Sequence, residues 1–295
     1  MAKILPVGVL LINAFIWGVS WWPLRELQTA GLHPLWSTVI MYCFAMAIVL
    51  LYKQSVWRAL ITHPQLWLLL LASGFTNVSF NWAVSIGDVV RVLILFYLMP
   101  AWVVLLAWLV LNERPNRFAY FRLMLAMTGV FIVLLPTSSI NLSSVLSQSL
   151  SFADVLAIVG GFTFALTQVL LKRMGDTPKE GRLFAMFAGG AILAALAGAL
   201  GIAQGWVSAL PEVSFYWLSV AALLSIAFMV GNAALQYAAP RLPANTTAVV
   251  MLTEIIFGSL YAVVLLVKTK KNPKPYESER LASTSYSYIN RLPAI

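Results

Sequence analysis

Nine runs of about 20 mostly apolar residues constrain what this sequence can fold into. Lipid offers no partner to a free backbone N–H or C=O group, so each run must satisfy its own hydrogen bonds as a helix. Of the 295 residues 61% are hydrophobic and 10% are charged, whereas soluble domains carry about 25% charged residues. We therefore predict an all-α polytopic membrane protein. The runs are residues 5–22, 34–52, 66–86, 91–111, 119–136, 152–171, 183–204, 214–237 and 245–267.

Basic residues gather on one side of these predicted helices. With a cytoplasmic N-terminus, the outside loops up to the ninth helix hold only Arg25 and Arg91. The positive-inside rule supports that orientation, in a cell inner (plasma) membrane. The net charge of +9 is then a topology signal, and we expect no nucleic-acid partner. The inside loops hold Lys3, Lys53, Arg58, Arg114, Arg117, Arg122, Lys172, Arg173, Lys179, Arg182 and Arg241.

A serine-rich stretch at residues 138–151 reads as an outside, periplasmic linker. It separates a first repeat of five helices, residues 1–137, from a second repeat at 152–267 in which four helices are found. Because an odd number of helices precedes the linker, the second half starts on the opposite side of the membrane. We therefore expect the two halves to be inverted relative to each other, a geometry that suits alternating access.

Two pairs of amides recur 155 residues apart in predicted helices. Asn77 and Asn81 lie four residues apart on one helical face, as do Asn232 and Gln236. An aromatic residue follows each pair, and these are Trp82 and Tyr237. Amides are costly in hydrocarbon, and each can both donate and accept hydrogen bonds. We predict that the pairs line a substrate cavity between the halves; the alternative is that they join adjacent helices as structural contacts.

Four further residues are candidates for transport roles. Trp17 and Tyr97 could stack against a planar or apolar part of a substrate, although many membrane tryptophans are interface anchors. Glu254 is the single acidic residue well inside a predicted span, which suggests a proton-coupling site or a hydrogen-bonded packing residue. Pro100 should kink the fourth helix and could act as a hinge.

No motif for catalysis, metal binding or nucleotide binding is present in the sequence. It has no GxxxxGK[ST], no GxSxG and no HExxH, and its single cysteine, Cys43, cannot form an internal disulfide. His33 and His63 have no spacing that would form a zinc site. We expect no cofactor, no metal and no enzymatic activity, so transport would use an ion gradient or the substrate's own gradient.

Several short elements resemble the drug/metabolite transporter (DMT) superfamily, specifically its EamA-type members. They are the run Tyr97-Leu98-Met99-Pro100, the helix end Asn112-Glu113-Arg114, Gly129 in the next helix, and Thr253-Glu254-Ile255, where Ile255 replaces the usual proline. The resemblance covers about residues 5–267. It implies ten helices in two inverted five-helix repeats, both termini inside, and export of small metabolites such as amino acids or of drugs. At the helix end we expect Glu113 and Arg114 to form an interfacial ion pair.

The end of the chain departs from the family pattern. Residues 268–295 are polar, basic and broken by proline, so the family's tenth helix is missing, and we predict a disordered tail. Three explanations remain open: a frameshifted or mis-assembled end, a genuine nine-helix protein, and an incompletely inserted ninth helix.

We predict a secondary transporter that moves a small-molecule substrate across the bilayer by alternating access. The leading function is export of amino acids or related metabolites. The alternatives are a drug or toxic-compound efflux permease, a truncated protein that does not transport, and an intramembrane enzyme. The sequence does not specify the oligomeric state.

Overall fold

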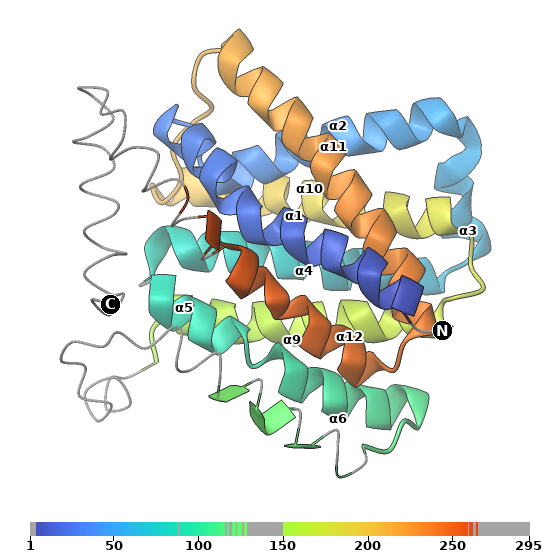
Figure 1. Ribbon diagram of the computed structural model, residues 1–295. Helices are drawn as coiled ribbons and strands as arrows, with labels where there is room; N and C mark the ends of the chain where they lie inside the picture. The colour runs from blue at the N-terminus through green and yellow to red at the C-terminus, as the bar shows by residue number, and fades with distance from the viewer. Residues whose placement is uncertain are drawn as a thin grey trace, which may run out of the picture.

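The computed structural model describes residues 4–87, 89–115, 150–258 and eleven further residues between 117 and 264. All regular structure in these ranges is helical (Figure 1). The helices are α1 (Ile4–Thr29), α2 (Pro34–Tyr52), η1 (Gln54–Arg58), α3 (Ala59–Thr62), α4 (Gln65–Ile86), α5 (Val89–Phe96), α6 (Met99–Leu111), α9 (Phe152–Arg173), α10 (Lys179–Ala203), α11 (Phe215–Ala238), η2 (Ala239–Arg241) and α12 (Ala244–Met251).

The predicted all-α polytopic membrane fold is confirmed. Six helices of the described part are long and apolar enough to cross a membrane, and a seventh results if α4 is joined to the short helices before it. The predicted span 245–267 begins as α12, and residues 253–258 continue it as helix. Most of the run 119–136, residues 138–149 of the predicted linker, and the tail 268–295 lie outside the described residues.

The first helix is longer than the apolar pattern indicates. It continues through Pro23 to Thr29, seven residues beyond the predicted end. A proline inside a helix removes one backbone hydrogen bond, and surrounding packing can offset that loss in a membrane protein. Leu27, near this end, is fully buried in a cluster with residues of α2, α10 and α11. The tertiary contact therefore extends the helix past the proline.

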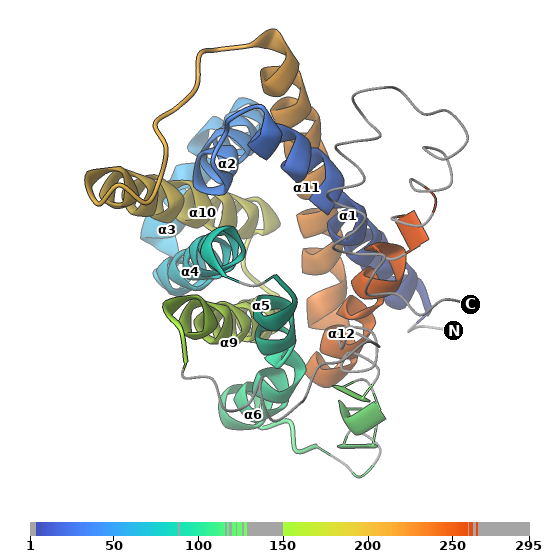
Figure 2. The same ribbon diagram turned by 90° about the vertical axis from the view of Figure 1, so that its left-hand side faces the viewer.

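The helices form two bundles that each combine elements from both halves of the chain. One, the α9 bundle, consists of α4, α5, α6 and α9; the other, the α1 bundle, consists of α1, α11 and α12. Helices α2 and α10 pack against each other, α10 also packs on α4, and α2 also packs on α11. Figure 2 shows α1, α11 and α12 on one side of the molecule and α4, α9 and α5 on the other.

The helix contacts follow a twofold pattern. Helix α9, the first of the second half, packs on α4 and α6, and helix α1, the first of the first half, packs on α11 and α12 in the matching way. The second helices of the two halves meet each other, and so do the fourth helices, α6 and α12. This is the contact pattern of two similar halves related by an axis. Their inversion across the membrane depends on a fifth span that is mostly outside the described residues, so it stays a prediction.

The fourth helix of each half has a local irregularity of one or two turn residues near its middle, which is called a break below. Helix α5 ends at Phe96, residues 97 and 98 form a turn, and α6 begins at Met99. Helix α12 ends at Met251, and the helix resumes at residue 253 after one turn residue, Leu252. The backbone of Leu252, with φ of −62° and ψ of −15°, stays in the right-handed helical region, so Ala244–Gly258 is one apolar helix with a local irregularity. The breaks at Tyr97 and Leu252 are 155 residues apart, the same separation that relates the two amide pairs.

At each break, a glycine on the first helix of the other half approaches the backbone closely. A Cβ atom added to Gly161 of α9 would lie 2.6 Å from the carbonyl oxygen of Phe96. A Cβ atom added to Gly18 of α1 would lie 2.5 Å from the carbonyl oxygen of Glu254. Both distances are shorter than any side chain tolerates, so a glycine lets α9 and α1 reach the broken helices. The first helices thereby hold the breaks in place.

Candidate substrate site where the broken helices meet

The two broken helices are joined by a hydrogen bond between Tyr97 and Glu254. The Tyr97 hydroxyl donates to Oε1 of Glu254 at 2.7 Å. Tyr97 is buried and Glu254 is partly buried. Tyr97 lies at the break between α5 and α6, and Glu254 lies two residues after the break at Leu252. The bond therefore connects the α9 bundle to the α1 bundle beside both helix breaks.

Trp17 lies on α1 beside Gly18, the residue that approaches the Glu254 carbonyl closely. Its ring stacks on Phe228 of α11, with the centroids 4.6 Å apart and the planes 18° apart. Trp17 also packs against a hydrophobic cluster that includes Tyr97 and Leu252. The structure thus brings three of the sequence-predicted residues, Trp17, Tyr97 and Glu254, into one region. Together they supply an aromatic face, a hydroxyl and a carboxyl group.

Pro100 lies in the first turn of α6, immediately after the break. The helix has a two-residue turn beside the predicted kink, although Arg91–Leu111 still counts as one span. The proline fits there because an N–H group in the first turn of a helix has no partner within that helix. A cavity of about 200 Å³ lies between α6 and α12. It is lined by Pro100, Val104, Leu123, Asn245, Thr246, Val249 and Val250, so its walls are mainly apolar with an amide and a hydroxyl on one side.

The amides of the first half bond to α2. The Tyr42 hydroxyl donates to Oδ1 of Asn77 at 2.7 Å, and Nδ2 of Asn77 donates to the carbonyl of Ser73 at 2.8 Å. Nδ2 of Asn81 donates to the hydroxyl of Thr38 at 2.5 Å. Both amides are half-buried. Each therefore has a protein partner that joins α4 to the second helix of its own half.

The amides of the second half take the matching position against their own helix and α10. Asn232 donates to the carbonyl of Phe228 at 2.9 Å. Gln236 is 3% exposed, and its amide bonds to α10 in either orientation. In one, Oε1 accepts from Nε of Arg182 at 3.3 Å; in the other, the nitrogen donates to the carbonyl of Lys179 and the oxygen accepts from the N–H of Leu183, both at 3.2 Å. The twofold pattern of the amides is therefore present in the fold. Within the described residues no hydrogen bond connects one pair to the other, and the predicted substrate contact stays a prediction.

The two aromatic residues that follow the amides lie in different surroundings. The Trp82 ring lies 6.0 Å, centroid to centroid, from the rings of Phe152 and Trp206, away from the helix breaks. Tyr237 is 37% exposed, and the guanidinium of Arg241 lies 4.1 Å over its ring. Each ring comes one residue after an amide, so it lies on a different face of the helix from the amides. The structure does not bring Trp82 and Tyr237 together with Trp17 and Tyr97.

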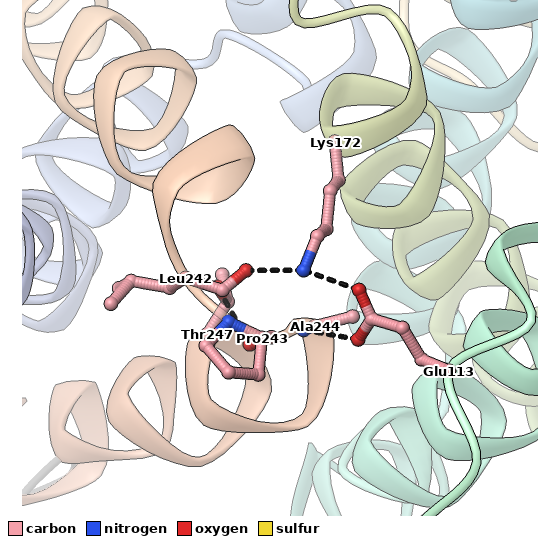
Figure 3. Close-up of polar contacts among 6 residues, drawn as sticks. All are labelled: Glu113, Lys172, Leu242, Pro243, Ala244 and Thr247. Atoms are coloured by element: carbon pink, nitrogen blue, oxygen red, sulfur yellow. Dashed lines mark hydrogen bonds and ion pairs between the residues drawn. The ribbon is translucent and has the colours of Figure 1, made fainter.

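A polar clamp joins the two bundles at the other end of α6 (Figure 3). Lys172, in the last turn of α9, forms an ion pair with Glu113 and donates a hydrogen bond of 2.7 Å to the carbonyl of Leu242. The second carboxylate oxygen of Glu113 accepts from the backbone N–H of Ala244 at 3.2 Å. Ala244 is the first residue of α12, where a negative charge is favourable. An ion pair of the α9 bundle thus bonds two backbone groups at the start of α12.

The sequence does not predict this clamp. The predicted ion pair of Glu113 with Arg114 is wrong, since the structure pairs Glu113 with Lys172 and leaves Arg114 exposed. Asn112 adopts a left-handed conformation with φ of 55° at the end of α6, and this turn directs the next residue toward α9. The charge pattern identifies Lys172 only as one of the cytoplasmic cations. Adjacent charges in a sequence carry no signal for a partner 59 residues away.

The comparisons with known proteins agree with this geometry. Residues 5–135 match the model of the EamA-like transporter family. A protein of Vibrio cholerae serotype O1, described as an uncharacterized transporter, is 27% identical over 159 residues, which is 50% of this chain and 53% of that protein. The match therefore spans about half the length of this curated relative. A crystal structure of another protein shares the fold with a TM-score of 0.66 and 15% identity, over 89% of this chain and 88% of that one.

Proposed function

Residues 5–135 are an EamA-like transporter family domain, and from this premise we propose that the chain is a secondary transporter of small organic solutes. The observation that carries the proposal is the hydrogen bond that joins the fourth helices of the two halves, Tyr97 to Glu254, beside a local irregularity in each helix. Transporters use discontinuous helices at the interface of two repeats to expose polar groups in mid-membrane. The orientation follows the charge pattern, with the N-terminus in the cytoplasm and the protein in the inner membrane.

Alternating access would proceed by rocking of the α9 bundle against the α1 bundle. Hydrogen bonds connect these bundles at two levels, at Tyr97–Glu254 and at the clamp of Glu113 and Lys172 with the start of α12. Since α6 ends on the cytoplasmic side in the proposed orientation, the clamp would hold the inside closed. Opening toward the cytoplasm requires Glu113 and Lys172 to release Ala244 and Leu242. Water can replace both of those hydrogen bonds at the membrane surface, so the release is reversible.

Amino acids and related metabolites are the substrate class that these groups fit best. A carboxylate at Glu254 can bind an amino group, the Tyr97 hydroxyl can donate to or accept from a polar group, and Trp17 offers an apolar face. In the alternative, drug efflux, a bulky aromatic compound would occupy the same region and use the rings more than the carboxylate. Amino-acid export would depend on the Glu254 carboxylate more than drug efflux would. We propose export as the direction.

Glu254 is also the residue proposed to couple transport to protons. A charged side chain at the bilayer centre costs about 2.5 to 3.5 kcal/mol on insertion scales, so an acid there is retained for a partner or for proton exchange. Its hydrogen bond to Tyr97 supplies a partner on the opposite bundle. Proton binding would weaken the acceptor and favour separation of the bundles. A proton and a substrate amine would then compete for one carboxylate.

Export can be measured in cells that express the chain. Cells loaded with isotope-labelled amino acids are resuspended in fresh medium, and the labelled compounds released are quantified by mass spectrometry. We expect faster release of a subset of amino acids, a loss of that release with Glu254→Gln, and little change with the partly exposed Leu105→Ala. Release that is equal to that of cells without the protein, together with efflux of aromatic dyes, would favour the drug permease.

A further inference from the structure

The segment between α2 and α4 runs across the spanning direction. Residues 54–62, formed by η1 and α3, make an angle of 109° with α4. Large side chains of this region are exposed: Tyr52 is 81%, Trp57 46% and Ile61 67% exposed. Aromatic residues at such positions favour the boundary between lipid headgroups and hydrocarbon. The segment therefore has the orientation and the surface of an interfacial helix.

A cavity of about 230 Å³ lies between this segment and the start of α10. Its base is tightly packed, because a Cβ atom added to Gly181 of α10 would lie 2.8 Å from the Cβ of Ala59. The volume is below the roughly 300–1,000 Å³ of sites for drug-sized ligands, and it suits a small headgroup. The lining residues are Lys53, Ser55, Val56, Arg58, Ala59, Thr62, His63, Pro178, Glu180 and Gly181.

The charged groups of this cavity are mainly basic. Among the described residues, neither Lys53 nor Arg58 forms an ion pair with a carboxylate. The Arg58 guanidinium lies 5.6 Å from the centroid of the Trp57 ring, so it is held at the same surface as that aromatic residue. Glu180 contributes one negative charge in the first turn of α10, where the helix dipole favours it. Two cations without carboxylate partners thus face one acid that is stabilised by its own helix.

The rest of the lining is neutral and partly polar. Ser55 supplies a hydroxyl, whereas the Thr62 hydroxyl already donates to the carbonyl of Arg58 at 3.2 Å and lies 2.9 Å from Nδ1 of His63. Hydroxyl, ammonium and guanidinium groups are the donors that bind phosphate oxygens. The cavity opens on the cytoplasmic side in the orientation that the charge pattern gives, where anionic lipids attract Lys and Arg.

We propose that this cavity binds the headgroup of an anionic phospholipid, with Lys53 and Arg58 on the phosphate and Trp57 and Ile61 against the acyl chains. Exposed apolar side chains beside the cavity distinguish a lipid from a soluble anion, because a free phosphate has no use for them. The inference stands apart from the transport function, since it concerns residues on η1, α3 and α10 and none at the helix breaks.

Lipid binding to the purified full chain tests this site. The protein in neutral detergent is titrated with phosphatidylglycerol, phosphatidylcholine or inorganic phosphate, and retained lipid and thermal unfolding are measured. We expect phosphatidylglycerol to be retained and to raise the unfolding temperature, and phosphatidylcholine and phosphate to do neither. The double variant Lys53→Gln/Arg58→Gln should bind phosphatidylglycerol roughly thirtyfold more weakly, since each basic residue at an anionic surface contributes a factor of about five.

The matched control is Arg114→Gln/Arg173→Gln, which removes two exposed cations outside this cavity. We expect it to bind phosphatidylglycerol as the native chain does. An equal loss of phosphatidylglycerol binding in both double variants would show that only the total charge matters, and it would overturn the site. Equal retention of the two lipids by the native chain would overturn it without any variant. Binding of inorganic phosphate as strong as that of phosphatidylglycerol would replace the lipid with a soluble anion.

Discussion

The Tyr97 hydroxyl and the Glu254 carboxylate meet at 2.7 Å across the two bundles, beside two helix breaks that are 155 residues apart in the sequence. A hydrogen bond at this place connects parts that alternating access must separate. It also keeps an acidic side chain paired in the interior of an apolar fold, where an unpaired one would be costly. The contact between Tyr97 and Glu254 can therefore serve both stability and movement.

Removing the Tyr97 hydroxyl should change transport more than folding. Tyr97→Phe keeps the ring in its cluster and removes the donor to Glu254. Hydrogen bonds between membrane helices average about 0.6 kcal/mol with a maximum of about 1.7, so we expect a roughly threefold to fifteenfold change in transport rate. Thermal unfolding in detergent should shift little. A variant that transports at the native rate would show that the bond is not broken during the cycle.

The glycines at the helix breaks should not tolerate a side chain. Gly161→Ala and Gly18→Ala each place a Cβ atom 2.6 Å or less from a carbonyl oxygen, and we expect each to destabilise the fold by about 1–3 kcal/mol. Gly8→Ala is the control, because nothing lies within 4 Å of its added Cβ. Thermal unfolding of the purified proteins measures the difference. Equal stability of all three variants would contradict the close approach of α1 and α9 to the breaks.

Loss of the Glu113 charge should open the cytoplasmic side. Glu113→Gln weakens the ion pair with Lys172 and the cap on Ala244, both partly exposed contacts, so we expect only a small loss of stability. In a Cys43→Ser background, a cysteine introduced by Thr246→Cys in the neighbouring cavity should be labelled several times faster from the cytoplasm. Arg114→Gln should leave labelling unchanged. Equal labelling rates for the Glu113→Gln and Arg114→Gln variants would contradict a gating role for the clamp.

The pair Tyr42 and Asn77 should show a measurable coupling in stability. Tyr42→Phe, Asn77→Leu and the double variant form a double-mutant cycle that isolates their 2.7 Å hydrogen bond. We expect a coupling of about 0.6 kcal/mol, the average for such contacts between membrane helices. Transport by Asn77→Leu decides the remaining question. A normal rate would make this amide a packing residue, and a large loss with retained stability would support its predicted contact with the substrate.

The sequence was sufficient for most of the spans that the structure describes and for the twofold pattern, because both depend on local composition and on repetition along the chain. Pro100 indicated the turn between α5 and α6, and no residue signalled the turn at Leu252. Tyr97 and Glu254 were each selected for their side-chain chemistry. Their contact could not be predicted, since one sequence does not report which residues of two distant helices face each other.

The residues that bond to the amides could not be predicted from the sequence, for a related reason. The repeat indicated that Asn77 matches Asn232 and that Asn81 matches Gln236. The groups that bond to these amides, such as Tyr42 at Asn77 and residues of α10 at Gln236, belong to no repeated pattern. The predicted first span ends too early because the apolar run stops at residue 22, and composition does not show that Leu27 beyond it is buried. The clamp depended on the turn at Asn112, a backbone conformation that sequence periodicity does not encode.

Proton-driven transport by purified protein tests the central claim most directly. The native chain and Glu254→Gln are reconstituted in proteoliposomes that contain a mixture of isotope-labelled amino acids, and release is followed with and without a pH gradient. We predict that the gradient accelerates release by the native chain, and that release by Glu254→Gln is slow and does not respond to the gradient. A variant that responds to the gradient as strongly as the native chain would contradict the assignment of the Tyr97–Glu254 junction as the coupled transport site.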